Sequence, residues 1–252
     1  MRIQQIRNAT LKLRYGGVTF LTDPWLQPRG AGPACETVRP EMADVRSPMD
    51  DLPEPPERIV AGVDCCLVSH LHFDHFSPDC LPRSLPLIAQ NAENAARLRA
   101  MGFADVRCFE GGEMRVGAVT ICKTTAVHGD NAETVREMGE TSGFVLSAPD
   151  EKTLYLAGDT IWCAEVEHAV DRFRPGVIVV NCCEATLPVG RLIMDLADLE
   201  RVSRRAPEAA VIASHLDSVN HALLTGDEVR QFVRERSLQN VRVPQNGETL
   251  AF

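Results

Sequence analysis

The chain has 252 residues, of which 44% are hydrophobic and only 5% aromatic, and its formal net charge is −9. This length allows one large α/β domain or two small ones, with a core of aliphatic side chains. The acidic balance argues against a dedicated nucleic-acid binder, which usually carries a basic face. The residues after Met1 lack the apolar core of a signal peptide, and no apolar run has transmembrane length. We therefore expect a cytoplasmic protein that acts on a small molecule; whether it forms a homo-oligomer stays open.

The nine cysteines do not indicate a disulfide framework, because their number is odd and their spacing irregular. Cys65-Cys66 and Cys182-Cys183 lie in or beside apolar runs, where cysteine behaves as a small hydrophobic residue. We expect reduced, mostly structural cysteines, although the segment 181–185 also follows a predicted strand closely enough to line a pocket.

The N-terminal residues predict a β-hairpin. Residues 3–13 and 18–21 have the character of strands, and Gly16-Gly17 between them is a turn signal. The hairpin ends in Asp23-Pro24. Asp-Pro often simply begins a turn, so the pattern alone does not decide whether Asp23 has a further role.

Residues 27–58 form a proline-rich segment. Eight prolines occur from Pro24 to Pro56, counting both of these residues, and the segment has little hydrophobic periodicity. A loop this long inside a compact domain is usually either functional or disordered. Our hypothesis is that it lies over the mouth of an active site and helps to select the substrate; a flexible surface insertion is the alternative.

The densest chemical signal is the stretch from Ser69 to His75. It follows an apolar run, residues 63–68, that predicts a buried strand, and it places three histidines and an aspartate within six positions. Side chains alternate along extended chain, so His70 and His72 point the same way. If the chain then turns into a helical start, Asp74 and His75 reach the other side of a shared cavity. Imidazole and carboxylate together suit zinc, manganese or iron, whereas surface histidines in a polar turn are the alternative.

Later strands also end in potential metal ligands. A strand over 119–127 leads to His128, and a hairpin over 142–147 and 153–157 leads to Asp159, which alternatively caps a helix. A strand over 209–213 leads to His215, and His221 follows in a loop, where it either contacts substrate or has no special role. A further strand is predicted over 177–180, and helices over 91–101, 165–173, 195–205 and 227–236.

The stretch His70-Leu71-His72-Phe73-Asp74-His75 resembles the His-x-His-x-Asp-His motif of the metallo-β-lactamase fold superfamily. Together with Gly158-Asp159-Thr160 and Ser214-His215, it looks most like the branch that contains L-ascorbate-6-phosphate lactonase and N-acyl phosphatidylethanolamine phospholipase. The resemblance implies an α/β fold, the four-layer αβ/βα sandwich, with two mixed β-sheets flanked by helices. The whole chain, 1–252, would form one such domain, with an insertion at about 27–58.

The resemblance also implies a role for each candidate residue. Two divalent ions, zinc or manganese and alternatively iron, would share the site, and Asp23 would support it from outside the ligand set. The ligands would be His70, His72 and His128 for one ion, Asp74, His75 and His215 for the other, and Asp159 as the bridge.

The implied activity is metal-dependent hydrolysis. A hydroxide bridging the two ions would attack an ester, a lactone or a phosphorylated small molecule, with Asp74 and Asp159 as catalytic residues. Two alternatives have the same ligands: a phosphodiesterase or nuclease that acts on nucleotides, and an iron-dependent oxygenase or redox protein. The sequence does not distinguish these substrates, because two metal ions polarise many kinds of bond.

Overall fold

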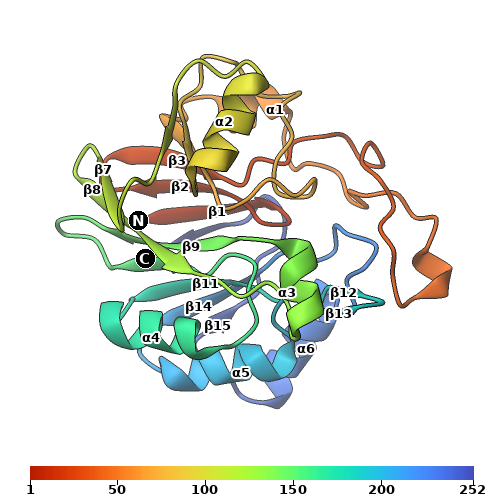
Figure 1. Cartoon of the computed structure of the whole chain (residues 1–252). Helices are drawn as coiled ribbons and strands as arrows, with labels where there is room; N and C mark the ends of the chain where they lie inside the picture. Colours follow the sequence, from red (N-terminus) through yellow and green to blue (C-terminus); the bar gives the residue numbers. More distant parts are fainter.

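The computed structural model describes residues 1–252, and its main feature is a pair of seven-stranded sheets (Figure 1). The first sheet has the order β16-β1-β2-β3-β4-β5-β6, with parallel pairing from β3 to β6 and antiparallel pairing elsewhere. Its strands are β1 (Arg2–Arg7), β2 (Thr10–Tyr15), β3 (Val18–Thr22), β4 (Cys65–Val68), β5 (Leu87–Ala89), β6 (Val106–Cys108) and β16 (Thr249–Ala251).

The second sheet is also mixed and has the order β15-β14-β11-β10-β9-β8-β7. The predicted hairpin is present in it, because β9 and β10 pair antiparallel. Its strands are β7 (Glu113–Val116), β8 (Val119–Thr125), β9 (Ser142–Ser147), β10 (Leu154–Leu156), β11 (Val177–Asn181), β14 (Ala210–Ser214) and β15 (Val241–Arg242). A separate two-stranded ribbon consists of β12 (Thr186–Leu187) and β13 (Gly190–Arg191).

Helices cover the outer faces of both sheets, which confirms the predicted four-layer sandwich (Figure 1). The first sheet is covered by α1 (Pro56–Val60) and α2 (Ala92–Ala100). The second is covered by α4 (Ala164–Phe173), α5 (Leu196–Arg205) and α6 (Gly226–Glu235). Helix α3 (Ala132–Met138) contacts β13, and a short 3-10 helix, η1 (Pro40–Met42), lies in the proline-rich segment. None of these helices is long and apolar enough to cross a bilayer.

Three hydrophobic clusters hold the four layers together, one between the sheets and one under each helical layer. Strand alternation divides residues between them: Cys65 lies in the cluster between the sheets, while Cys66 lies under the helices of the first sheet. All nine cysteines are free.

Two parts of the chain differ from the sequence-based expectation. Residues 3–13 are not one strand, because the chain turns at Asn8, whose φ of 51° is left-handed. Asparagine tolerates this conformation better than most residues, so the hydrophobic pattern alone does not reveal the turn. The end of the chain, for which no strand was predicted, adds the edge strands β15 and β16 to the two sheets. Their short length is typical of edge strands.

The topology brings the ends of several strands to one side of the sandwich. Asp23 directly follows β3, and His70 comes two residues after β4. The remaining candidates follow strands of the second sheet at similar distances: His128 after β8, Asp159 after β10 and His215 after β14.

Candidate metal centre

The structure gathers all seven predicted ligands into one cluster. Three overlapping groups each have their potential ligand atoms within 4.8 Å of one another: His70, His72 and His128; His70, His75 and Asp159; and Asp74, His75 and His215. The carboxylate of Asp159 lies in the middle. Its Oδ2 is 3.1 Å from Nε2 of His75, 3.4 Å from that of His128, 3.9 Å from that of His70 and 4.0 Å from that of His215.

Unusual backbone conformations position two of these side chains. Gly158 has a φ of 71°, and a Cβ there would lie 2.5 Å from the carbonyl oxygen of Ser142, so only glycine fits before Asp159. His215 has a φ of 64°, which is rare for a residue with a side chain. Its backbone N–H donates to the carbonyl oxygen of Asn8, at a distance of 3.1 Å. The left-handed turn at Asn8 therefore supports the left-handed residue His215.

Every histidine of the cluster has one ring nitrogen next to a partner outside the centre, while the other nitrogen faces the centre. For His215 the inward nitrogen, Nε2, also lies 3.1 Å from Nδ2 of Asn8. This arrangement fixes the orientation of each ring and is typical of metal-ligating histidines. The partners are the Oγ of Ser69 for His70 (2.9 Å), the carbonyl oxygen of Met138 for His72 (3.1 Å), Oδ2 of Asp23 for His75 (3.0 Å), the carbonyl oxygen of Leu192 for His128 (3.0 Å) and Sγ of Cys183 for His215 (3.5 Å).

Asp23 contacts His75, a predicted ligand, and also Ser69, which is hydrogen-bonded to the predicted ligand His70. Its Oδ1 accepts from the backbone N–H of Ser69 at 2.7 Å, and its Oδ2 accepts from the Ser69 hydroxyl at 2.7 Å. The same Oδ2 lies 3.0 Å from Nδ1 of His75. Asp23 therefore orients His75 directly and His70 through Ser69.

The buried carboxylates give the cluster an excess of negative charge. Burial alone would lower the pKa of His75, but the carboxylates of Asp159, Asp74 and Asp23 raise it to about 10. Burial would raise the pKa of Asp159, yet the histidines around it hold that pKa well below its usual range. Burial and the neighbouring His128 lower the pKa of His72 to about 4, so this ring is neutral at neutral pH, as a ligand must be.

The donor set fits one or more divalent cations. Nε2 of His70 is buried and has no hydrogen-bond partner, although it faces the carboxylate of Asp159 at 3.9 Å. An unpartnered buried nitrogen next to a carboxylate is unfavourable unless a cation lies between them. Imidazole and carboxylate ligands together suit zinc, manganese or iron.

A cavity of about 190 Å³ opens onto the cluster. Beyond the cluster residues, the cavity wall is mainly apolar, and it includes neither lysine nor arginine. His221 also lines it, and the buried Nδ1 of His221 has no hydrogen-bond partner. The other lining residues outside the cluster are Cys35, Phe73, Met138, Ala185, Leu187 and Leu192.

Comparison with known proteins agrees with this geometry. A family model described as the beta-lactamase superfamily domain matches residues 2–215. The chain belongs to the beta-lactamase superfamily. The chain is also similar to UPF0173 protein YddR of Bacillus subtilis. The two sequences are 36% identical, and the match covers 100% of both.

Two solved structures of the superfamily share the fold closely. A possible metal-dependent hydrolase from Veillonella parvula has a TM-score of 0.95 at 35% identity, covering 100% of this chain and 99% of that one. An isothiocyanate hydrolase from Delia radicum gut bacteria has a TM-score of 0.93 at 36% identity, with the same coverage. The expectation of a metal-dependent hydrolase is thus confirmed at the level of the family, whereas the resemblance to the ascorbate-phosphate lactonase branch stays a prediction.

Two residues outside the superfamily motifs contact the cluster: Asn181, which belongs to the segment 181–185 that the sequence allows to line a pocket, and Asn8, which was not predicted. The amide of Asn181 donates to Oδ1 of Asp159 at 2.7 Å, and the amide of Asn8 donates to the carbonyl oxygen of Asp74 at 3.0 Å. Asn181 lies at the end of β11, so its position was a usable signal. Asn8 had none, because its role depends on the unpredicted turn.

The proline-rich segment contributes Cys35 to the wall of the cavity. The buried side chain of Asn220 fixes this part of the segment, since its Oδ1 accepts from the N–H of Cys35 at 3.0 Å. Its Nδ2 donates to the carbonyl oxygens of Cys35 at 2.8 Å and Met42 at 3.1 Å. Asn220 lies five residues after His215, so one loop follows a predicted ligand and also holds the segment.

Proposed function

We propose that the chain is a metal-dependent hydrolase that holds two divalent cations, zinc or manganese and alternatively iron, in the cluster. The observation that carries this proposal is the pattern of hydrogen bonds to the five histidines, each with one nitrogen fixed from outside and the other turned inward. One ion would be held by His70, His72 and His128 and the other by Asp74, His75 and His215, with Asp159 bridging.

Bound there, the cations would supply a hydroxide nucleophile at neutral pH and an electrophile for the developing negative charge. The protein's own groups support the rest of the reaction. Asp74 is buried, and His75 and His215 keep its pKa well below the usual range, so its carboxylate is available to orient the attacking water. His221, whose side chain lines the cavity, would hold the substrate.

The cavity favours a small, uncharged and partly apolar substrate. Phe73, Met138 and Leu187 exclude water from one side, and no lysine or arginine is present to bind a phosphate. A phosphorylated substrate is therefore less favoured than the uncharged ones. An ester or a lactone suits the same cavity and is the second candidate.

We propose an isothiocyanate as the first substrate class to test. The support is the 36% identity, over the full chain, to the isothiocyanate hydrolase, together with the apolar cavity. The oxygen of water would bond to the central carbon of R–N=C=S, and the bond between that carbon and the nitrogen would break. Both protons of water would pass to the nitrogen. The products are then the amine R–NH₂ and carbonyl sulfide.

The decisive experiment compares substrates on one preparation of known metal content. Purified protein is stripped of metal, reloaded with zinc, manganese or iron, and assayed with phenethyl isothiocyanate, phenyl acetate, a γ-lactone and bis(p-nitrophenyl) phosphate. We expect the isothiocyanate to be hydrolysed fastest, only by loaded protein, with equal amounts of amine formed and isothiocyanate lost. Equal activity of stripped protein would overturn the metal assignment. Preference for the phosphodiester would favour the nuclease alternative, and oxygen consumption by the iron-loaded form the oxygenase alternative.

A further inference from the structure

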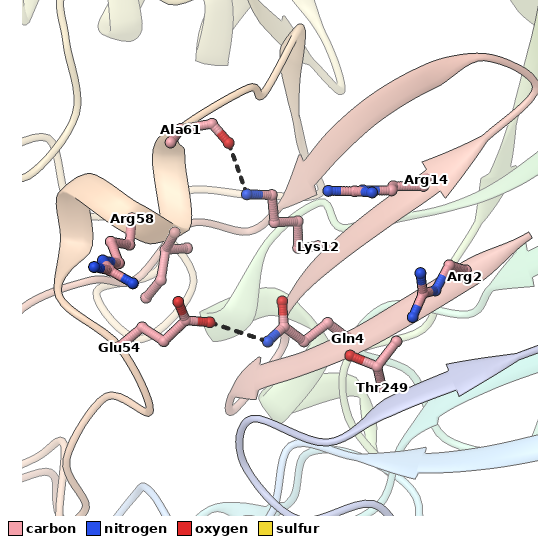
Figure 2. A pocket seen from close by; sticks show the side chains of 9 residues that line it. Arg2, Gln4, Lys12, Arg14, Glu54, Arg58, Ala61 and Thr249 are labelled. Atoms are coloured by element: carbon pink, nitrogen blue, oxygen red, sulfur yellow. Dashed lines mark hydrogen bonds between the residues drawn. The ribbon is translucent and has the colours of Figure 1, made fainter.

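A second chemically distinct site lies on the outer face of the first sheet, where four cations surround a pocket (Figure 2). Strands β1 and β2 carry Arg2, Lys12 and Arg14, while α1 carries Arg58. The pocket has a volume of about 370 Å³, which is within the range of small-molecule sites. Its wall contains one carboxylate, that of Glu54, so four cations against one anion leave a net charge of three positive.

Strand register forces these cations together. Arg2 pairs directly with Arg14 across the β1–β2 ladder, and Gln4 pairs with Lys12. The alternate residues Ile3 and Leu13 are buried between the sheets, so the charged set must share the opposite face. Like charges directly opposite each other destabilise a sheet, and neither Arg2 nor Arg14 forms an ion pair that would offset this repulsion.

The four pocket cations differ from several arginines elsewhere on this acidic protein in having no ion-pair partner. Arg204, Arg205 and Arg236 each lie within ion-pair distance of a carboxylate. None of the four pocket cations forms an ion pair, and Glu54 instead accepts from the amide of Gln4 at 3.3 Å. Lys12 donates only to the carbonyl oxygen of Ala61, at 2.8 Å. Burial and the charge of Arg14 lower the pKa of Lys12, while the nearby carboxylate of Glu54 opposes this shift.

We propose that this pocket binds a small anion of the phosphate class, with a diphosphate group as the best match. Arginine side chains bind phosphate oxygens with paired N–H donors. The pocket has a net charge of three positive, so a ligand with several negative charges matches it better than a ligand with a single carboxylate. The wall includes only two hydrophobic residues, Ile59 and Ala61, so the ligand has little apolar surface. The net charge of −9 on the chain opposes an extended polyanion such as nucleic acid.

This site is separate from the metal centre, because the two share no lining residue. The proposal therefore does not depend on the hydrolase assignment. It also explains why phosphate-binding side chains, absent from the catalytic cavity, are concentrated on another face of the molecule.

The test is a titration of the metal-loaded protein with inorganic pyrophosphate at low salt. Nuclear magnetic resonance spectra monitor the backbone amide signals of residues 2–4, 12–14, 54 and 57–61. We expect saturable shifts at these residues. Arg14→Ala should weaken binding about tenfold, and the double variant Arg2→Ala/Arg14→Ala at least about thirtyfold. Arg97→Ala removes the same charge from an exposed position on α2 and should leave the affinity unchanged.

Several outcomes would overturn the proposal. Shifts confined to residues 70–75 and 215 would place the anion at the metal centre only. An equal loss of affinity in the Arg97→Ala control would reduce the effect to general surface charge. Sedimentation with vesicles containing phosphatidic acid, without any shift on addition of pyrophosphate, would replace the small ligand with a membrane surface. Since Arg2 and Arg14 are both exposed, thermal unfolding of the variants should be unchanged, which keeps loss of folding from imitating loss of binding.

Discussion

The two sheets contribute to the metal centre in different ways. After β4 of the first sheet, one short loop supplies His70, His72, Asp74 and His75. The second sheet supplies His128, Asp159 and His215 one at a time, from the ends of three strands. The four residues after β4 can be recognised as a motif in the sequence. The three residues from the second sheet come together with them only after the sheets have packed. The complete ligand set is thus a property of the sandwich rather than of either sheet.

The largest effect is expected where the two contributions meet, at Asp159. Asp159→Ala removes the carboxylate whose Oδ2 lies within 4.0 Å of four histidine nitrogens. Because both proposed cations lose a ligand, activity should fall by about 10⁴-fold, as expected when several kcal/mol of charge stabilisation are lost at each ion. Elemental analysis should find less than one ion per chain. The exposed Asp105→Ala is the matched control, and an Asp159→Ala protein with both ions bound would contradict the bridging role.

Single substitutions, one from each sheet, separate the two ligand groups. His72→Ala and His215→Ala should each reduce activity by about 10³-fold, since each removes a ligand of one proposed ion only. Each variant should keep about half of the metal of the parent protein. His168→Ala, on the exposed face of α4, should change neither quantity. If His72→Ala and His215→Ala both lost all metal, the two groups would not be separable sites.

A smaller effect is expected at Asp23, which contacts no proposed ion. Asp23→Asn keeps the shape of the side chain but removes the charge that orients His75 and, through Ser69, His70. Substitutions of such supporting residues cost about 10- to 100-fold in metal affinity or activity. Competition with a metal chelator measures this loss. An unchanged chelator profile would mean that Asp23 serves only as the start of a turn.

The smallest effect on activity is expected at Asn220, which lies outside the cluster. Asn220→Ala removes three hydrogen bonds to the proline-rich segment. Loss of such buried partners costs about 1–3 kcal/mol of stability, and KM should rise several-fold with kcat nearly unchanged. Limited proteolysis should cut residues 30–45 faster in this variant than in Arg46→Ala, in which the exposed arginine loses its bonds within the segment. Equal cleavage in both would indicate a surface insertion without a lid role.

The local His-x-His-x-Asp-His motif carried the resemblance that implied the fold and the seven ligand candidates. Four of these candidates lie in the stretch that follows β4, and the other three lie close to the ends of β8, β10 and β14. Supporting residues were harder to find. Asn8 contacts Asp74 across 66 positions of sequence, by way of a left-handed turn inside what looks like continuous strand. Cys35 reaches the cavity only because Asn220 holds the proline-rich segment there.

The hydrogen bonds of Asp23 bear on the order in which the two proposed metal ions bind. Its carboxylate holds His75 of one ligand group and, through Ser69, His70 of the other. In the proposed two-ion centre, ordering this side chain for the first ion would also order a ligand for the second, so the second ion would bind at a lower entropic cost. Loading should then be cooperative, with few singly occupied molecules at half saturation. Replacement of Asp23 should uncouple the two events into separate binding steps.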